Sequence, residues 1–370
     1  MEENSNDLNI LIAVGGTGGH LFPARALALE LIRKRPAVRI TFIGAGLKKN
    51  TYFEKDLFPF LDIDGETPFK KAPIPILKAL LKISKGLKHS LRFIEQKKPD
   101  LIVGFGSYHT FPAICAAKLK KIPIILFESN AFPGRVNRFC SKWAKISAIQ
   151  FSPARDYLKS DCVCVRMPGL KKERAPSQKK ARTYFGLEEG RLTFLISGGS
   201  QGAQSINRLI CGALEPLTLK GIRFQVVHIV GDVRRIDKLR AVYENYRIPS
   251  SIKVFEKKME YAWIAADLSI SRAGSATVAG LIEFSIPSIL IPYPFAIDKH
   301  QSRNAAFVTE EIKGAVTLEE KSLRGSILAD TIGRLLDNDR EGLKKMKGAL
   351  KHFKKEENKE DLCSVVLKTL

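Results

Sequence analysis

Two glycine-rich turns follow apolar runs in this 370-residue chain, one in each half. The first turn, Gly15–His20, follows the apolar run Asn9–Val14, and the second, Gly198–Ala203, follows Leu192–Ser197. A strand that ends in such a turn and leads into a helix aims free backbone N–H groups at an anion or a developing charge. The pair of turns therefore predicts two nucleotide-fold halves with a cleft between them.

His20 stands where the first turn becomes a helix. Four glycines precede it at positions 15, 16, 18 and 19, and glycine lets another group approach the backbone closely, which favours a functional histidine. The spacing does not match the G-x-G-x-x-G turn of dinucleotide-binding folds. The next predicted strand ends in Ile43–Gly46, with no acidic residue to hold a ribose, so we do not expect an NAD site.

Further polar segments of the second half could bind a phosphorylated sugar. Gly198–Gly202 offers a hydroxyl and several N–H groups, Arg272 could face a diphosphate, and Asp298–Asn304 could bind sugar hydroxyls. All of them follow predicted strands, where open α/β sheets bind ligands. Asp62 and Asp64 could chelate Mg²⁺, but so short a match is common by chance, and we expect no metal.

Short apolar runs alternate with amphipathic helical segments such as 23–34 and 111–120, which predicts mostly parallel sheets covered by helices. We predict an N-terminal Rossmann-like domain over residues 1–168, a linker over 169–180, a second such domain over 181–340 and a basic helical tail over 341–370. The predicted strands are Asn9–Val14, Arg39–Ile43, Leu101–Gly104, Ile122–Phe127, Ile146–Ile149, Leu192–Ser197, Phe224–Val230, Ile252–Phe255, Leu268–Ser271 and Ile289–Ile291.

The chain carries 61 Lys and Arg against 38 Asp and Glu, a formal charge of +23. Such an excess predicts an anionic partner, and the lack of a nucleic-acid-binding motif disfavours DNA or RNA. Lysines and apolar residues mix at helical spacing over Phe69–Lys85, which fits a helix on an anionic membrane surface or a core helix with a solvated lysine face. We expect a cytoplasmic protein with reduced cysteines, because there is no secretory signal, spanning segment or paired cysteine framework.

The order of these motifs resembles the MurG family of bacterial peptidoglycan glycosyltransferases. The resemblance implies a GT-B type α/β fold with two Rossmann-like domains, mostly parallel sheets and an interdomain cleft. It implies an inverting, metal-independent hexosyltransferase without a cofactor, which moves N-acetylglucosamine from UDP-N-acetylglucosamine (UDP-GlcNAc) to the 4-hydroxyl of the muramyl sugar of lipid I, giving lipid II. The resemblance runs from about Asn9 to Leu336 and is carried by Gly15–His20, Gly104–Tyr108, Glu128–Asn130, Gly198–Ala203, Ser271–Gly274, His300–Gln301 and Asn304–Ala305.

The implied partners are UDP-GlcNAc, undecaprenyl-linked lipid I and the anionic inner-membrane surface, with no nucleic acid, at the cytoplasmic face. The N-terminal domain would bind the acceptor and the membrane, the C-terminal domain would bind the donor, and His20 would be catalytic. The expected donor-binding residues are Thr17, Gly18, Gly19, Asn130, Ser200, Glu256, Arg272, Ser275, Ala276, Thr277, Gly280, Glu283, His300 and Gln301. The expected membrane-docking residues are Phe69, Lys70, Lys71, Ile74, Ile76, Leu77, Leu80 and Leu81.

The chain departs from the family pattern at three places, and one is Phe127–Asn130, which reads Phe-Glu-Ser-Asn where the family has a His-Glu-Gln-Asn-like run. Gly280 stands where the family has a glutamate that binds the ribose, and Glu283 lies one helical turn further on and could replace it. Leu170 stands where the family has an arginine, whose charge Lys171 or Arg166 could supply. Two alternatives therefore stay open. One is a related UDP-sugar transferase with another glycolipid acceptor, and the other is a catalytically weakened UDP-sugar-binding homologue.

Overall fold

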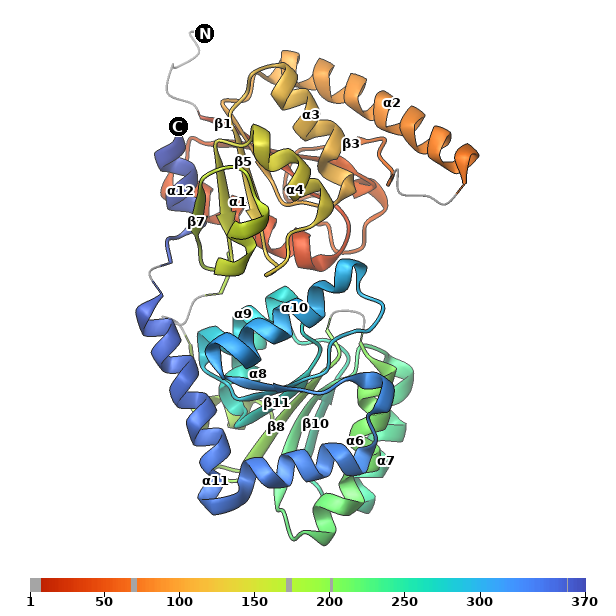
Figure 1. The fold of residues 1–370 in the computed structure, drawn as a ribbon, viewed down its shortest axis with the longest axis vertical. Coiled ribbons are helices and arrows are strands. Elements are labelled where there is room, and N and C mark those ends of the chain that lie inside the picture. The colour runs from red at the N-terminus through yellow and green to blue at the C-terminus, as the bar shows by residue number, and fades with distance from the viewer. Residues whose placement is uncertain (1–7, 68–71, 171–174, 200–201, 358) are drawn as a thin grey trace. The chain divides into compact units, whose positions relative to one another are not determined.

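The computed structural model describes residues 8–67, 72–170, 175–199, 202–357 and 359–370 (Figure 1). Two compact units make up the chain: Met1–Gly169 together with Lys359–Leu370, and Leu170–Asn358. Each unit holds one parallel sheet with helices packed against it. Within the described ranges, no helix has both the length and the apolar composition needed to cross a bilayer.

The first unit has a seven-stranded sheet in the order β3-β2-β1-β4-β5-β6-β7, and every pairing is parallel. Its strands are β1 (Asn9–Ala13), β2 (Arg39–Ala45), β3 (Phe60–Ile63), β4 (Leu101–Gly104), β5 (Ile124–Glu128), β6 (Ile146–Ile149) and β7 (Cys162–Cys164). Its α-helices are α1 (Gly18–Lys34), α2 (Pro73–Lys97), α3 (Phe111–Leu119), α4 (Arg135–Cys140) and α12 (Leu362–Thr369). Its 3-10 turns are Leu47–Lys49, Tyr108–Thr110, Ser141–Trp143 and Ser152–Tyr157.

The central strands of this sheet are apolar because both of their faces are covered. All residues of β4 and β5 are buried, and α2 and α3 pack against one face of the sheet. The edge strands β3 and β7 were not predicted. Their residues are mostly half-buried, so neither shows the continuous apolar run that marks a central strand.

The second unit repeats the same topology with a six-stranded parallel sheet in the order β10-β9-β8-β11-β12-β13. Its strands are β8 (Leu192–Ser197), β9 (Phe224–Ile229), β10 (Ser250–Lys253), β11 (Leu268–Ser271), β12 (Ser288–Leu290) and β13 (Ala315–Thr317). Its α-helices are α5 (Gln178–Tyr184), α6 (Gln204–Leu219), α7 (Ile236–Asn245), α8 (Met259–Ala265), α9 (Ser275–Phe284), α10 (His300–Ala306) and α11 (Gly325–Glu356). A π-helical segment spans Phe307–Ile312, and 3-10 turns span Val233–Arg235, Ile297–Lys299 and Glu320–Ser322.

The edge strand β13 was not predicted, and its residues are mostly half-buried. The bounds of β9, β10 and β12 also differ from the predicted runs, because β9 ends one residue earlier and β12 lies one residue earlier. The strand β10 begins two residues before the predicted run that starts at Ile252, since its ladder with β9 starts at Ser250. The long helix α11 packs on α6 and is interrupted at Asp337–Arg340, where the backbone leaves the helical region.

The C-terminal segment does not form the single tail over residues 341–370 that the sequence suggests. The helix α11 belongs to the second unit, whereas α12 packs on α1 in the first unit. The Lys34 ammonium group lies 2.5 Å from Asp361, and the backbone N–H of Arg166 donates to the Glu360 carbonyl at 2.9 Å. The amphipathic pattern of these helices predicts an apolar face but not the surface that covers it.

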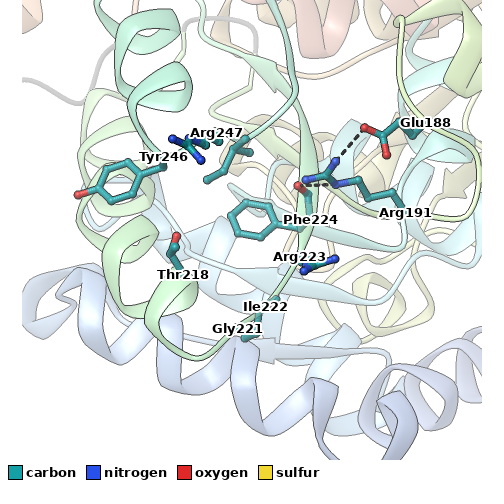
Figure 2. A pocket seen from close by; sticks show the side chains of 10 residues that line it. Glu188, Arg191, Thr218, Gly221, Ile222, Arg223, Phe224, Tyr246 and Arg247 are labelled. Atoms are coloured by element: carbon teal, nitrogen blue, oxygen red, sulfur yellow. Dashed lines mark hydrogen bonds and ion pairs between the residues drawn. The ribbon is translucent and has the colours of Figure 1, made fainter.

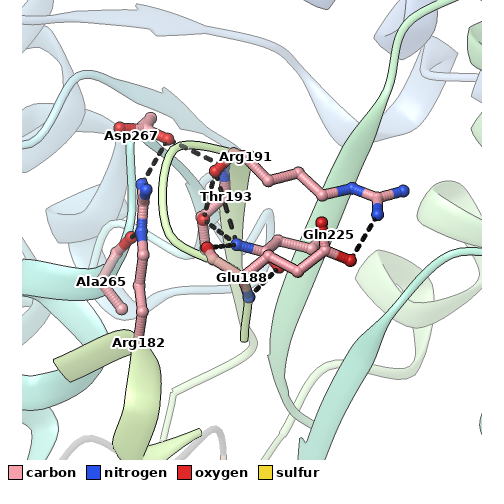
Figure 3. A network of polar contacts seen from close by, with 7 residues as sticks. All are labelled: Arg182, Glu188, Arg191, Thr193, Gln225, Ala265 and Asp267. Atoms are coloured by element: carbon pink, nitrogen blue, oxygen red, sulfur yellow. Dashed lines mark hydrogen bonds and ion pairs between the residues drawn. The ribbon is translucent and has the colours of Figure 1, made fainter. Parts of the chain in front are cut away.

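A buried polar network ties together the amino ends of the strands in the second unit (Figure 3). The guanidinium group of Arg182 lies 2.9 Å from the Asp267 carboxylate, which also accepts a hydrogen bond from the backbone of Thr193 at 2.8 Å. The Gln225 amide donates to the Thr193 hydroxyl at 3.0 Å. Because these partners satisfy one another at the end of the sheet opposite the glycine turn, we assign this network a structural role.

His228 of β9 should make the stability of the second unit depend on pH. Its ring nitrogens bond the Tyr243 hydroxyl and the Asn207 side chain, and burial lowers its pKa to about 3. The unfolded chain takes up a proton near pH 6.5, so the free energy of unfolding should fall by about 1.4 kcal/mol per pH unit as the pH drops from 6.5 towards 3. Urea titrations between pH 7 and 5 measure this slope. The slope should be smaller in H228Q, and equal slopes would contradict the assignment.

Candidate active site

The two glycine turns begin where the strand order of the sheets reverses, one in each unit, and Arg272 follows β11 at that point of the second sheet. In the first sheet the connections after β1 and β4 diverge at this point, and in the second sheet those after β8 and β11 do so. A crevice opens between such diverging connections at the carboxyl ends of the strands, and open α/β sheets bind ligands there. The topology therefore predicts that a ligand binds at the carboxyl end of the strands in each sheet.

The first glycine turn connects β1 to the start of α1. The backbone N–H of Phe105 donates to Ala13 at 2.9 Å, which fixes β4 beside the turn. The helix begins at Gly18 after Thr17, whose side chain makes no capping hydrogen bond, so N–H groups of the first turn stay available to an anion. Thr17, Gly18, Gly19 and His20 thus lie together at the start of α1, and His20 is partly exposed.

The sequence suggested that these glycines let a ligand approach the backbone. In the structure, packing inside the unit accounts for several of them. A methyl group on Gly15 would lie 2.5 Å from Cβ of His109, and one on Gly18 would lie 2.7 Å from the Phe22 ring. Gly16 has φ +88°, a conformation that favours glycine. The sequence did not point to His109, because its contact with Gly15 joins two residues that are more than ninety positions apart in the chain.

A buried carboxylate orients Asn130 after β5. One oxygen of Glu128 accepts hydrogen bonds from the Asn130 backbone at 2.9 Å and from its side-chain amide at 3.1 Å. The other oxygen accepts from the Gly134 backbone at 3.0 Å and from the Asn137 amide at 2.9 Å. Burial raises the pKa of Glu128, and these four hydrogen bonds oppose the rise. Glu128 therefore fixes the loop that presents Asn130.

The Asp62 carboxylate organises a backbone turn in the structure. Its two oxygens accept hydrogen bonds from the Gly46 and Lys48 backbone at 2.7 and 2.9 Å. Asp64 lies 3.6 Å from the Lys85 ammonium group. Among the residues that the structure describes, no group of three or more His, Cys, Asp or Glu side chains could hold a metal ion.

The second glycine turn connects β8 to α6 and has no room for side chains at Gly198 and Gly202. A methyl group on Gly198 would overlap the backbone of Gly202 and Ala203, and one on Gly202 would lie 2.6 Å from the Val230 carbonyl. Gly199 and Gly202 have φ of +82° and +71°. Ser200 lies outside the described residues, and so do Phe69, Lys70, Lys71 and Lys171.

The buried guanidinium group of Arg272 ties four segments together. It donates to the Ile291 carbonyl at 3.0 Å and to the Ser205 hydroxyl at 2.9 Å, and it forms an ion pair with Glu320. It thereby links the ends of β11 and β12 to the start of α6 and to the segment after β13. Contact between Arg272 and a diphosphate stays a prediction.

Three of the expected donor-binding residues form the first turn of α9. Ser275, Ala276 and Thr277 follow Gly274 at its N-terminus. A methyl group on Gly280 would overlap the buried indole of Trp263, so the space beside this position is already filled. This contact provides a steric reason for the glycine.

Glu283, one turn further along α9, already has a partner. The Lys354 ammonium group lies 2.7 Å from its carboxylate and 2.7 Å from its backbone carbonyl. Its carboxylate side chain is 17% exposed. The role of Glu283 toward a ribose stays a prediction.

Glu256 lies a few residues after β10 and is nearly buried. Its carboxylate accepts hydrogen bonds from the Lys253 side chain at 2.5 Å and from the Lys258 backbone at 2.8 Å. Burial acts to raise the pKa of Glu256, but these hydrogen bonds outweigh it and leave the pKa below its usual value. The carboxylate thereby fixes the backbone turn that follows β10.

His300 and Gln301 begin α10. The Gln301 side chain accepts from the Tyr293 backbone at 3.0 Å, and Nδ1 of His300 lies 2.8 Å from the Ile297 carbonyl. The buried Asn304 amide donates to the Ala273 carbonyl at 3.0 Å. This last bond fixes α10 beside the end of β11, so these two residues lie near the α9 turn.

The first turns of α2 carry apolar side chains that no core covers. Ile74, Leu77, Leu80 and Leu81 are 68, 61, 50 and 63% exposed, and Ile76 is partly exposed. The later part of the helix packs on α3, so the exposed large apolar residues of α2 are confined to its N-terminal part (Figure 1). They lie beside a 400 Å³ groove lined by Glu66, Ile74, Pro75, Lys78, Leu81 and Lys82. This part of α2 is a basic surface with an exposed apolar stripe.

A larger pocket of 540 Å³ lies elsewhere in the second unit (Figure 2). Its lining includes residues at or next to the first residues of β8 and β9, at the amino end of the sheet. It is therefore at the opposite end of the sheet from Gly198 and Arg272. The lining residues are Glu188, Arg191, Thr218, Gly221, Ile222, Arg223, Phe224, Tyr246, Arg247 and Ile248.

Comparison with known protein families gives two matches, one in each half of the chain. Residues 10–149 match the glycosyltransferase family 28 N-terminal domain, and residues 193–362 match the glycosyltransferase family 28 C-terminal domain. The two matched segments include most of the residues described above.

Individual proteins resemble the chain over nearly its whole length. A Protochlamydia amoebophila protein named UDP-N-acetylglucosamine–N-acetylmuramyl-(pentapeptide) pyrophosphoryl-undecaprenol N-acetylglucosamine transferase is 40% identical, over 97% of this chain and 95% of its own. A Thermodesulfovibrio yellowstonii protein of the same name is 36% identical, over 94% and 95%. The crystal structure of Acinetobacter baumannii MurG superposes with a TM-score of 0.74 at 26% identity, covering 93% of this chain and 95% of that one.

Proposed function

Because the chain belongs to the MurG family within glycosyltransferase family 28, we infer that it transfers N-acetylglucosamine from UDP-GlcNAc to lipid I, giving lipid II for peptidoglycan synthesis. The observation that carries this inference is 40% identity over 97% of the chain with a transferase named for that reaction. The two parallel sheets are those of a GT-B glycosyltransferase.

The reaction we propose is a single displacement at the anomeric carbon of N-acetylglucosamine. The 4-hydroxyl oxygen of the muramyl sugar forms the new bond, while the bond to the UDP oxygen breaks and configuration inverts. The hydroxyl proton passes to a general base, for which we propose His20 at the start of α1. The bonding electrons leave with UDP.

Charge on the departing diphosphate must be stabilised without a metal in this mechanism. The N-termini of α6 and α9 follow glycine turns at the carboxyl ends of β8 and β11, so both can direct N–H groups toward an anion. We propose that Ser200 and these N-termini bind the diphosphate. Arg272 supports the same region through its bonds to Ile291 and Ser205.

The remaining donor contacts that we propose come from both units. Asn130, oriented by Glu128, would hydrogen-bond the transferred sugar, and Thr17, Gly18 and Gly19 would face the sugar and its diphosphate. In the second unit, the turn at Glu256 would meet uracil, and Gln301 with His300 would hold sugar hydroxyls. The nucleotide would lie along α9, past Ser275, Ala276, Thr277 and Gly280, with Glu283 near the ribose.

We propose that the N-terminal part of α2 docks on an anionic membrane surface. Its exposed leucines could enter the lipid boundary, while Lys78 and neighbouring lysines meet lipid headgroups. Replacing both Leu77 and Leu81 by glutamate should lower the fraction that sediments with anionic phospholipid vesicles severalfold. Activity on a soluble lipid I analogue should stay unchanged, because neither residue touches the proposed active site.

Leu219 offers a matched control for this prediction. It is 81% exposed, at the end of α6 in the other unit, so L219E adds one negative charge without changing α2. L219E should sediment with vesicles like the unchanged protein. Equal sedimentation of the Leu77/Leu81 variant and L219E would show that α2 is not the docking surface.

A transfer assay tests the proposed function directly. Radiolabelled UDP-GlcNAc is incubated with lipid I in one reaction and with diacylglycerol in another, and labelled lipid is separated and counted. Labelled lipid II is the expected product. Label on diacylglycerol alone would indicate a different lipid acceptor, and binding of UDP-GlcNAc without transfer would indicate a homologue that has lost catalysis.

A further inference from the structure

Ser107 and His109 follow β4 at the point where the order of the first sheet reverses. The Ser107 hydroxyl and Nδ1 of His109 are 2.8 Å apart and share a hydrogen bond. Neither residue has a role in the reaction proposed above. Both contact the turn that leads into His20, so their arrangement can affect the position of that turn.

The imidazole of His109 packs on the backbone of the first glycine turn. A methyl group on Gly15 would lie 2.5 Å from Cβ of His109, and one on Gly16 would lie 3.4 Å from both Nδ1 of His109 and the Ser107 hydroxyl. On the β2 side, the Asn50 amide donates to the Gly16 carbonyl at 2.6 Å. The turn is therefore held by the histidine and serine after β4 and by the asparagine after β2.

Ser107 adopts a backbone conformation that suits glycine. Its φ of +70° and ψ of 152° lie in a region that other residues enter only when the surrounding structure compels them. The Thr110 hydroxyl and backbone N–H both donate to the Ser107 carbonyl, at 3.0 and 3.2 Å, which helps to fix this conformation. Because glycine would adopt it without strain, the serine side chain must contribute something, and its hydrogen bond is to His109.

The surroundings of His109 favour its neutral imidazole. Burial lowers its pKa, and the negative charge of Asp62 opposes that shift without reversing it. A neutral imidazole has one donor and one acceptor nitrogen, so Nδ1 can pair with a hydroxyl in either direction. The pair therefore holds the turn by packing and hydrogen bonding.

We propose that Ser107 and His109 form a positioning pair that fixes the Gly15–Thr17 turn and, through it, the place of His20 at the start of α1. The proposal rests on the function inferred above, in which this turn and His20 act on the sugar. The pair itself touches neither the sugar nor the reacting hydroxyl. Its contribution is to hold the turn amides and the base in one arrangement before substrate binds.

Four variants test the pair: H109A, H109N, S107G, and S107G combined with H109A. For each, kcat and KM are measured with UDP-GlcNAc and lipid I, the dissociation constant for UDP by calorimetry, and the melting temperature. H109A should lower kcat about tenfold or more while the UDP dissociation constant stays within about twofold. H109N should recover most of the loss, because its amide can occupy the position of Nδ1 beside Ser107.

The double variant reports whether the two residues act as a unit. S107G loses the hydroxyl but relieves the backbone, so the total loss of kcat in the double variant should be much smaller than the product of the two single losses. Unchanged kcat in H109A, or equal losses in H109A and H109N, would overturn the proposal. Losses of melting temperature and UDP affinity that parallel the loss of kcat would also overturn it, since they indicate general destabilisation.

Failure of the proposed function can be told apart from failure of the pair. If the unchanged protein transfers no sugar to lipid I, the proposed function is wrong. Hydrogen exchange at the backbone of residues 15–17 then tests the pair without any substrate. Faster exchange in H109A than in H109N would support the positioning role, and equal exchange would contradict it.

Discussion

Alanine in place of His20 should lower the turnover number by about 10²–10⁴-fold, the range over which a general base contributes. The methyl group of alanine cannot accept the proton of the attacking hydroxyl, so the displacement would depend on water. Affinity for UDP should be unchanged, because His20 is proposed to act on the attacking hydroxyl and most of the contacts that we propose for the nucleotide belong to the second unit. Initial rates with radiolabelled donor, together with calorimetric titration of UDP, measure both quantities.

His352 provides the control for this replacement. It lies on the surface of α11, where its ring is 3.2 Å from Glu356 and its side chain is 72% exposed. H352A should keep the turnover number and UDP affinity of the unchanged protein. A turnover number for H20A equal to that of H352A would show that another group removes the proton.

Replacing Gly198 by alanine should weaken donor binding strongly. The added methyl group would overlap the backbone of Gly202 and Ala203, and no side chain can rotate away to make room. The turn must therefore open, which displaces the N–H groups at the start of α6 that we propose for the diphosphate. We expect the KM for UDP-GlcNAc to rise by at least about tenfold, since each 1.4 kcal/mol of lost binding weakens affinity tenfold.

Gly348 is the matched control for the added methyl group. It lies within α11, and a methyl group there would have no neighbour within 4 Å. G348A should bind UDP normally and gain about 0.5–1 kcal/mol in unfolding free energy, because alanine favours the helix. Calorimetry with UDP and thermal melting distinguish the two variants. Normal UDP affinity in G198A would mean that this turn is not part of the donor site.

Central strands could be predicted from the sequence more closely than edge strands, of which only β10 was predicted, with shifted bounds. β4, β6, β8 and β11 have the predicted boundaries, because nearly all of their residues are buried and apolar side chains recur along them in the sequence. The edge strand β7 alternates cysteine and valine over three half-buried residues, which leaves no comparable signal. The parallel direction of the strands followed from the alternation of strands and helices.

The candidate site could be located from sequence, but its supporting contacts could not. The glycine turns can be recognised in the sequence because glycine, hydroxyl and imidazole groups follow directly after apolar runs. By contrast, Trp263 beside Gly280 and Asn50 on the Gly16 carbonyl join residues that lie far apart in the chain. Such pairs come together only in the folded chain, so no local sequence pattern predicts them.

The return of the last twelve residues to the first unit has a practical consequence for dissecting the protein. A fragment that stops at Gly169 would lack α12, leaving α1 uncovered and Lys34 without Asp361. Separate expression of the two halves therefore requires a rearranged gene, in which residues 359–370 are spliced to the first half through a short flexible tether.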